Sequence, residues 1–270
     1  MIAPLYEVLR QRGVKFEFFH KVESLELSAD QSTVQAVHFA VQATLKDRHR
    51  PYEPLIMVKG LPAWPGHAHY EQLEQGEALR EGKVDLESYW NGWQPVARRT
   101  LLAERDFDQL VFAISIGAVP YLCRELLEAK PQWRTMVEKV TTVQTQTMQL
   151  WLNRTTTELG WDIPFQNPTD TVIGATYLNP LDGQVDFTHL LKWEDWPQDS
   201  VPKSLWYFSG AMADYEAPPP FSDTSYPARA KARVQAQCVQ YLQASMGPLL
   251  PLATTNVAVS YTHLTLPTSD

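Results

Sequence analysis

Two groups of side chains in this chain are spaced in ways that could support chemistry. His67 and His69, one residue apart, could supply two ligands to a metal ion from an extended loop. No third histidine or cysteine lies near them in the sequence, so an ordinary surface loop is favoured and no metal site is predicted. Asp106 and Asp108 could form an acid–base pair. Aspartates just before an apolar run usually form its preceding turn, and that interpretation is favoured here too.

The remaining candidates are weaker. The aromatic run Tyr89–Trp93 could form a pocket wall, but a core cluster is favoured. Cys123 and Cys238 lie in apolar helical contexts without CxxC spacing, which predicts core residues. The sequence contains no GxGxxG, GxxxxGK[ST], GxSxG or HExxH motif. The chain therefore carries no recognisable phosphate-cradling loop, and the catalytic residues are unknown.

The first elements that would position a site are a helix and a hairpin. Residues 4–12 have the apolar spacing of a helix, and Gly13 follows as a C-terminal stop. Alternating residues from Val14 to Leu27 predict a strand. Turn-forming residues 28–32 then lead to a second strand around residues 34–41, which completes a hairpin.

The next elements lie on both sides of residues 110–117, which are expected to form a buried strand. Residues 46–95 are rich in proline and glycine and predict an irregular insertion with a short helix at 70–79. Residues 96–103 predict a strand, and helices are expected at 119–129 and 131–140. The run LVFAISIG at 110–117 is continuously apolar, which is typical of a strand in a parallel sheet covered by helices.

The second half of the chain has a different residue pattern, and we expect a domain boundary near residue 140. Strands are predicted at 144–152, 170–178 and 204–210, and a short helix at 188–193. Pro227 opens a strong helix that runs to about residue 245. These elements predict a mixed sheet with helices.

Composition narrows the class of partner. The net charge of -8 argues against a nucleic-acid-binding face, which needs clustered basic residues. No apolar run reaches the length of a membrane span. Two cysteines without partner motifs fit a reducing compartment such as the cytoplasm. Nine Trp and eleven Tyr suit a large core and an apolar pocket for a small-molecule substrate. The oligomeric state stays open.

The C-terminal residues 259–268 read VSYTHLTLPT, which is the translation of a transposon-type sequencing adapter. Residues 259–270 are therefore expected to be a non-native tail and are excluded from the fold prediction. A reading frame that enters an adapter also leads us to expect a fragment of a longer protein.

Four segments resemble the flavin amine oxidase/phytoene desaturase superfamily of FAD-dependent oxidoreductases. They are PLYEVLRQRGVKFEFFHKVESLEL, YEPLIMVKGLPAWP, FDQLVFAISIGAVPYLCREL and TVQTQTMQLWLNR. The similarity is closest to a bacterial branch described as NAD(P)-binding or FAD-dependent oxidoreductases, and it extends over most of residues 1–245. It implies FAD as cofactor and hydride transfer from an amine or an unsaturated apolar substrate to the flavin.

The resemblance also implies specific cofactor contacts. Val22 matches a valine whose backbone N–H and C=O contact the adenine end of FAD in that superfamily. Ala113, Ser115 and Gly117 match the strand end that approaches the cofactor, where small residues permit close approach. The superfamily's GxGxxG loop and its second FAD motif have no counterpart here, so this chain alone is expected to bind FAD weakly and to be inactive.

The expected fold class is α/β. Residues 1–140 would be a partial, Rossmann-like FAD-binding domain with an inserted antiparallel hairpin and the irregular insertion at 46–95. Residues 141–258 would be an α+β substrate domain. Two alternatives stay open: an NAD(P)-dependent dehydrogenase or isomerase on a related scaffold, and a non-catalytic protein that retains the fold.

Overall fold

The computed structural model describes residues 2–161, 173–175, 179–212 and 217–253. The chain forms two compact units. Unit 1 comprises residues 1–54 and 67–142, and unit 2 comprises residues 55–66 and 143–270. Both mix helices with antiparallel strands, so the α/β class is confirmed at this level. The expected tail at 259–270 lies outside the described residues.

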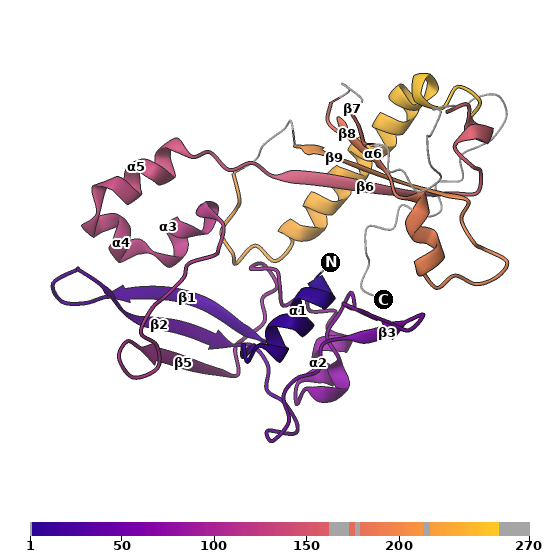
Figure 1. Cartoon of the computed structure of the whole chain (residues 1–270). Helices are drawn as coiled ribbons and strands as arrows, with labels where there is room; N and C mark the ends of the chain where they lie inside the picture. The colour runs from indigo at the N-terminus through magenta and orange to yellow at the C-terminus, as the bar shows by residue number, and fades with distance from the viewer. Residues whose placement is uncertain (1, 162–172, 176–178, 213–216, 254–270) are drawn as a thin grey trace. The chain divides into compact units, whose positions relative to one another are not determined.

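The sheet of unit 1 is antiparallel and has the order β1-β2-β5 (Figure 1). Its strands are β1 (His20–Leu27), β2 (Val34–Val41) and β5 (Ala97–Leu102). This confirms the predicted hairpin, and it adds β5 alongside β2. Helix α1 (Ile2–Gln11) precedes the sheet and ends before Gly13, whose φ of 87° suits glycine.

The predicted first strand begins later than expected, because the segment that follows α1 packs through aromatic rings. Residues 14–18 are not in a strand. The ring of Phe16 lies 4.7 Å from that of Tyr6 on α1, and the ring of Phe18 lies 5.1 Å from that of Tyr52. The alternating aromatic residues of this segment therefore pack on α1 and on the insertion, and they do not form a strand.

A network of hydroxyl groups stabilises the turn between β1 and β2. The carboxylate of Asp30 accepts hydrogen bonds from the Ser28 hydroxyl at 2.6 Å and from the Ser32 hydroxyl at 2.8 Å. The backbone N–H of Ser32 donates a further bond at 3.1 Å. These bonds favour the charged form and lower the pKa of Asp30 to about 2.

This lowered pKa predicts an acid-sensitive contribution to stability. Since the pKa of an unfolded aspartate is about 3.9, the contribution is complete above that pH and is lost as pH falls towards 2. Asp30→Asn should therefore be less stable than the wild type near neutral pH, and the gap should close in acid. Urea midpoints at several pH values measure it; a gap independent of pH contradicts the assignment.

Three short helices cover the sheet of unit 1 and form its first core. They are α3 (Val119–Leu122), α4 (Arg124–Ala129) and α5 (Pro131–Lys139). Both α3 and α4 pack on β1, where Leu25 joins Val119 and Leu122 in a buried cluster. Glu125 on α4 accepts a hydrogen bond from the backbone N–H of Leu27 at 2.8 Å, which satisfies a donor of β1.

The strand predicted at 110–117 is wrong. Residues 109–115 form no strand, and residues 116–118 form a short 3-10 helix before α3. The side chain of Val111 is 86% exposed, and Leu110 and Ile114 are about 40% exposed. Continuous apolarity does not specify a pairing partner, and no described strand pairs with this run. Within the described residues there is accordingly no parallel Rossmann-like sheet.

The insertion at 46–95 contains more regular structure than its composition indicates. Leu73 and Leu79 are fully buried and form a second core of unit 1 with Ala43 and Tyr52. They belong to a segment with a 3-10 turn at Tyr70–Gln72 and helix α2 (Gly76–Glu81). The insertion also contains an unpredicted hairpin, which belongs to unit 2 and consists of β3 (Ile56–Val58) and β4 (Leu61–Ala63).

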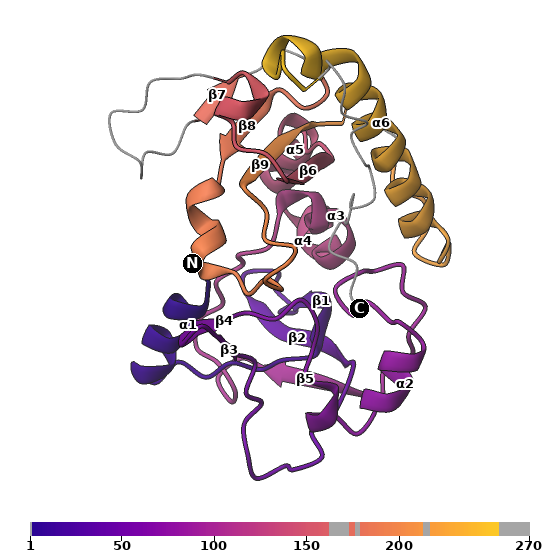
Figure 2. The same ribbon diagram turned by 90° about the vertical axis from the view of Figure 1, so that its right-hand side faces the viewer.

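The main sheet of unit 2 is antiparallel with the order β6-β9-β8-β7 (Figure 2). Its strands are β6 (Thr145–Leu152), β7 (Ile173–Ala175), β8 (Gly183–Asp186) and β9 (Ser204–Ala211). Strands β6 and β9 confirm predictions, and β8 was not foreseen. Of the strand predicted at 170–178, only β7 falls within the described residues. The 3-10 helices are Thr157–Leu159 and Thr188–Trp193.

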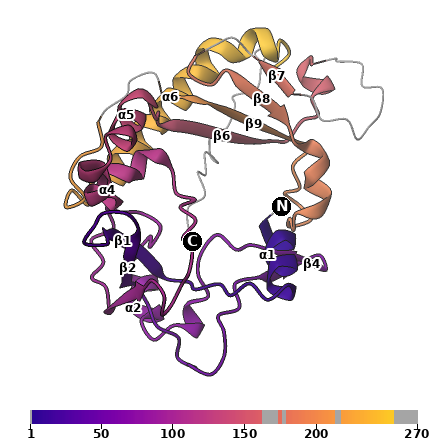
Figure 3. The same cartoon turned by 60° about the vertical axis from the view of Figure 1, so that its left-hand side comes forward.

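One long helix, α6 (Tyr226–Leu249), lies along a face of this sheet (Figure 3). Pro227 sits in its first turn, as predicted. Cys238 and Tyr241 on α6 pack against Met148 of β6 and against Trp206 and Phe208 of β9. None of the described helices combines the length and apolarity that crossing a membrane requires.

Candidate functional site

The structure places Val22 in an edge strand of unit 1. β1 is the first strand in the order β1-β2-β5, so one of its sides has no neighbouring strand among the described residues. Val22 pairs with Phe39 on β2, and the register shifts between Val22 and Ser24. An edge strand presents alternate backbone N–H and C=O groups away from its neighbour. Backbone groups along this edge could therefore reach a ligand.

The other predicted cofactor residues follow β5 in a segment that packs near the same strand. Phe112 and Ala118, which flank them, pack on the same cluster as Val22. Ala113 and Ser115 themselves are exposed. Gly117 does not leave an open approach: a Cβ there would lie 3.1 Å from the Thr142 hydroxyl oxygen, so Thr142 occupies the space that the missing side chain leaves.

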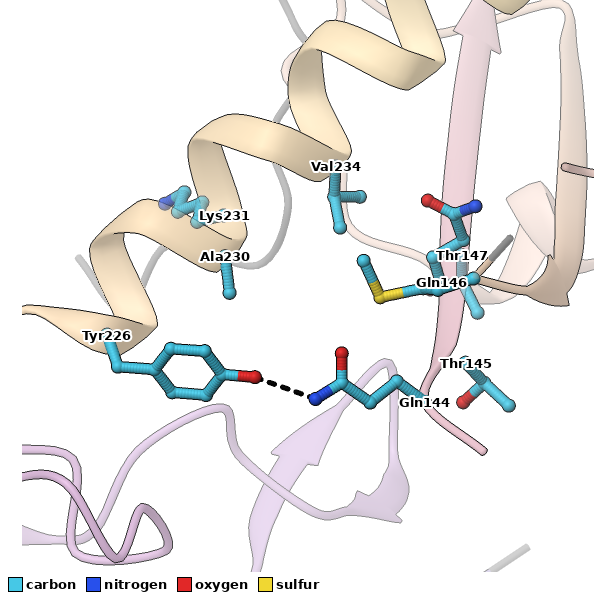
Figure 4. A pocket seen from close by; sticks show the side chains of 9 residues that line it. Gln144, Thr145, Gln146, Thr147, Tyr226, Ala230, Lys231 and Val234 are labelled. Atoms are coloured by element: carbon cyan, nitrogen blue, oxygen red, sulfur yellow. Dashed lines mark hydrogen bonds between the residues drawn. The ribbon is translucent and has the colours of Figure 1, made fainter. Parts of the chain in front are cut away.

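A pocket of about 400 Å³ lies in unit 2 between β6 and α6 (Figure 4). Strand β6 contributes one wall and the first turns of α6 contribute the other. The lining residues are Gln144, Thr145, Gln146, Thr147, Met212, Tyr226, Ala230, Lys231 and Val234. Its volume lies in the range of small-molecule sites, about 300–1,000 Å³. No histidine, cysteine or carboxylate is among these residues, and the ionisable side chains that line the pocket are those of Tyr226 and Lys231.

At one end of the pocket the polar groups bond to one another. The amide nitrogen of Gln144 donates a hydrogen bond to the hydroxyl of Tyr226 at 2.7 Å, which ties β6 to the start of α6 (Figure 4). The guanidinium of Arg233 approaches the Gln144 amide oxygen at 3.4 Å. Both ends of the Gln144 amide are thus engaged by the protein itself.

Gln146, two residues along the same face of β6, is different. The residue borders the pocket, but it is only 3% exposed, and its amide nitrogen and oxygen are both buried from the open space of the pocket. Neither its amide nitrogen nor its amide oxygen has a hydrogen-bond partner within the described protein. A buried polar group without a partner costs about 1–3 kcal/mol, so native proteins usually satisfy such groups. Gln146 is therefore the residue in this pocket that most needs an explanation.

This cost predicts that an apolar side chain at Gln146 should stabilise unit 2. Gln146→Met keeps the length of the side chain and removes the unpaired amide, so the free energy of unfolding should rise by about 1–3 kcal/mol. Gln149 lies on the same strand but is exposed, and Gln149→Met should be nearly neutral. Urea denaturation measures both variants. Destabilisation by Gln146→Met would mean that the amide has a structural partner.

His67, His69 and Asp106, which the sequence offered as metal-binding or acid–base candidates, each contact another side chain of the protein. His69 contacts the Glu71 carboxylate through Nδ1 at 3.0 Å, and the ring of His67 stacks on Tyr70. The described residues contain no cluster of three metal-ligand side chains. Asp106 accepts hydrogen bonds from the Arg105 side chain and from the Leu102 N–H, which closes the turn after β5 and lowers the pKa of its carboxyl.

Trp93 of the aromatic run and the two cysteines lie in or against hydrophobic core clusters. Trp93 packs on the second core of unit 1 and donates a hydrogen bond from Nε1 to the Gln42 carbonyl at 2.8 Å. Cys123 and Cys238 are both buried in core clusters, and burial raises the pKa of each thiol. A raised pKa disfavours the nucleophilic thiolate, so neither cysteine has the surroundings of a reactive residue.

Comparison with protein-family models, with curated proteins and with solved structures finds no match to this chain. The case for a function therefore rests on the residues of the chain and their geometry.

Proposed function

We propose that this chain is part of an FAD-dependent oxidoreductase. Unit 1 would contribute to the FAD-binding domain and unit 2 would contribute to substrate binding. The proposal starts from the resemblance of the four sequence segments to the flavin amine oxidase/phytoene desaturase superfamily. The structural observation that supports it is the position of Val22 in the edge strand β1, because a backbone contact to adenine needs N–H and C=O groups that no neighbouring strand uses.

The fit of the chain to FAD is limited to the adenine end. Backbone groups at Val22 would hold the adenine, whereas the chain has no glycine-rich loop that could hold the pyrophosphate. A Cβ at Gly117 would lie 3.1 Å from the Thr142 hydroxyl oxygen, so Thr142 narrows the approach to Gly117 on that side. When bound, the flavin would accept a hydride from an amine or an unsaturated apolar substrate.

The exposed apolar residues of the run 110–117 support assigning unit 1 to a larger domain. A side chain such as Val111, 86% exposed within an apolar run, gains stability when another element covers it. The buried free cysteines agree with a cytoplasmic location for that protein.

The decisive experiment is to read the gene upstream of the Met1 codon and to purify the longer product. We expect a GxGxxG motif that follows a predicted strand, and a yellow protein with the visible absorbance of oxidised flavin. A longer protein that is colourless, takes up no added FAD and binds NADPH would support a nicotinamide-dependent enzyme instead. A product that binds neither cofactor would support the non-catalytic alternative.

A further inference from the structure

We propose that two copies of this chain associate through strand β6 of unit 2, and that the two β6 strands pair antiparallel across a two-fold axis. Strand β6 lies at one end of the order β6-β9-β8-β7, so one of its sides has no neighbouring strand among the described residues (Figure 3). The inference goes beyond the flavin proposal and does not depend on it, because β6 belongs wholly to unit 2.

Strand β6 lacks the features with which proteins protect a sheet edge. An edge presents unpaired N–H and C=O groups, and charged side chains, prolines, bulges or a very short strand normally prevent another strand from pairing there. The eight residues of β6, TQTMQLWL, include neither a charge nor a proline. Residues 140–153 as a whole carry no charge. The pairing of β6 with β9 runs from Thr145 to Leu152 without a register shift. This edge is therefore long, regular and unprotected.

The other edges of the described sheets show the usual protection. Strand β5 carries Arg98 and Arg99 in its middle. Strand β1 carries several charges, and its register shifts between Val22 and Ser24 and again after Glu26. Strand β7 is three residues long, and so are both strands of the β3–β4 hairpin. Among the described edges, β6 alone is left suitable for pairing, which indicates that a partner strand covers it.

The charge of the chain favours a second copy as that partner. The net charge of -8 makes two copies repel each other in general. In a two-fold pair, residues near the axis meet themselves or close neighbours, so a charge there would face its own sign. Residues 140–153 carry no charge, so two copies can meet along them without that repulsion. A strongly charged partner would find no opposite charge on this edge to recognise.

The alternation of side chains fixes the geometry of the pair. Side chains that are paired across antiparallel strands point to the same face of the sheet. A two-fold axis perpendicular to the sheet also keeps α6 of both copies on one face. The axis must then pass through a residue, and the central residues of β6 are Met148 and Gln149. With either axis, Leu150, which is partly buried against the core of unit 2, lies opposite or diagonal to Met148 of the second copy.

This pairing adds backbone bonds and stops at two copies. Alternate residues of an antiparallel strand direct their N–H and C=O groups to one side, so two strands of eight residues exchange about eight hydrogen bonds. The joined sheet has the order β7-β8-β9-β6-β6-β9-β8-β7, with the short strand β7 at both ends. An isologous contact of this kind is closed, so we expect a dimer rather than a growing filament.

Sedimentation velocity of the full chain over a range of concentrations tests the proposal. The wild type should reach twice the mass of one chain. Gln149 is exposed, and its two copies lie opposite or diagonal to each other, about 4.5–8 Å apart. Gln149→Lys therefore brings two ammonium groups together and should weaken dimerisation at least about ten-fold. Val201→Lys is the control, because Val201 is exposed in unit 2 outside the sheet, and this variant should remain dimeric.

A charge-reversal pair separates loss of the contact from loss of the fold. Gln149→Glu alone should dissociate as Gln149→Lys does, whereas an equimolar mixture of the two variants should form a mixed dimer, since opposite charges then face each other. Only folded chains can restore the dimer in this way. A monomeric wild type, a dimer that withstands Gln149→Lys, or a mixture that stays monomeric would each overturn the proposal. Flavin binding by the longer protein is measured separately, so either proposal can fail without the other.

Discussion

Replacing Phe208 by alanine is expected to lower the free energy of unfolding of unit 2 by about 3–5 kcal/mol, the usual cost of truncating a buried phenylalanine. Phe208 is fully buried at the centre of the sheet, where β9 pairs with both β6 and β8. It lies opposite Met148 on β6, and its ring is 5.8 Å from the ring of Tyr241 on α6. The truncation therefore removes packing from the strand–helix interface that also forms the pocket.

Urea denaturation followed by tryptophan fluorescence measures this loss, since Trp206 lies two residues away on the same strand and shares the core. The control is Val201→Ala, because Val201 belongs to unit 2 and is 54% exposed. That control should change stability by less than about 0.5 kcal/mol. A loss at Phe208 no greater than at Val201 would contradict the core described here.

The hairpin and the long helix were predictable because their signals are local. The turn residues between β1 and β2 bond within the turn, as the Asp30 contacts with Ser28 and Ser32 show. Pro227 marks the start of α6 for a reason that holds in any helix: the first N–H groups lack partners anyway. Such features depend on a few adjacent residues, so a sequence reveals them without knowledge of the tertiary fold.

The run at 110–117 shows where local signals fail. Its apolarity indicates burial, but a strand also needs a neighbour, and the identity of that neighbour is not encoded in the run itself. Asp106 and Arg105 close a turn immediately before it, and the 3-10 helix at 116–118 follows it. The same limit explains why β8 was missed, since its four residues become a strand by pairing with β7 and β9.

The candidate residues of unit 1 came from the resemblance. The polar residues beside the pocket of unit 2 could instead have been found from the alternation of residues in β6. The alternation in QTQTM puts Gln144, Gln146 and Met148 on one face of the strand. Because Met148 is a core residue, the glutamines on its face must also lie towards α6. Two glutamines on a buried face indicate a polar site. Which of them is unpaired depends on Tyr226, far along the chain, and needs the structure.

The second large effect is expected at Gly76, the first residue of α2. In an ordinary helix, replacing glycine by alanine stabilises by about 1 kcal/mol. Here a Cβ would lie 1.8 Å from the backbone oxygen of Tyr70 and 2.6 Å from its carbonyl carbon. A main-chain group cannot rotate away as a side chain can. The 3-10 turn at Tyr70–Gln72 would have to move, and with it the fully buried Leu73.

Gly76→Ala should therefore reverse the usual sign and destabilise unit 1 by about 3 kcal/mol or more, as overpacking against a fixed neighbour does. Gly66, earlier in the same insertion, is the matched control, because a Cβ there meets nothing within 4 Å. Gly66→Ala should be neutral or stabilise by up to about 1 kcal/mol. Thermal unfolding of both variants measures the difference. Only the close approach of the Tyr70 backbone predicts opposite signs for the two alanines. A gain in stability at Gly76 would therefore show that the turn at Tyr70–Gln72 does not pack against α2 in this way.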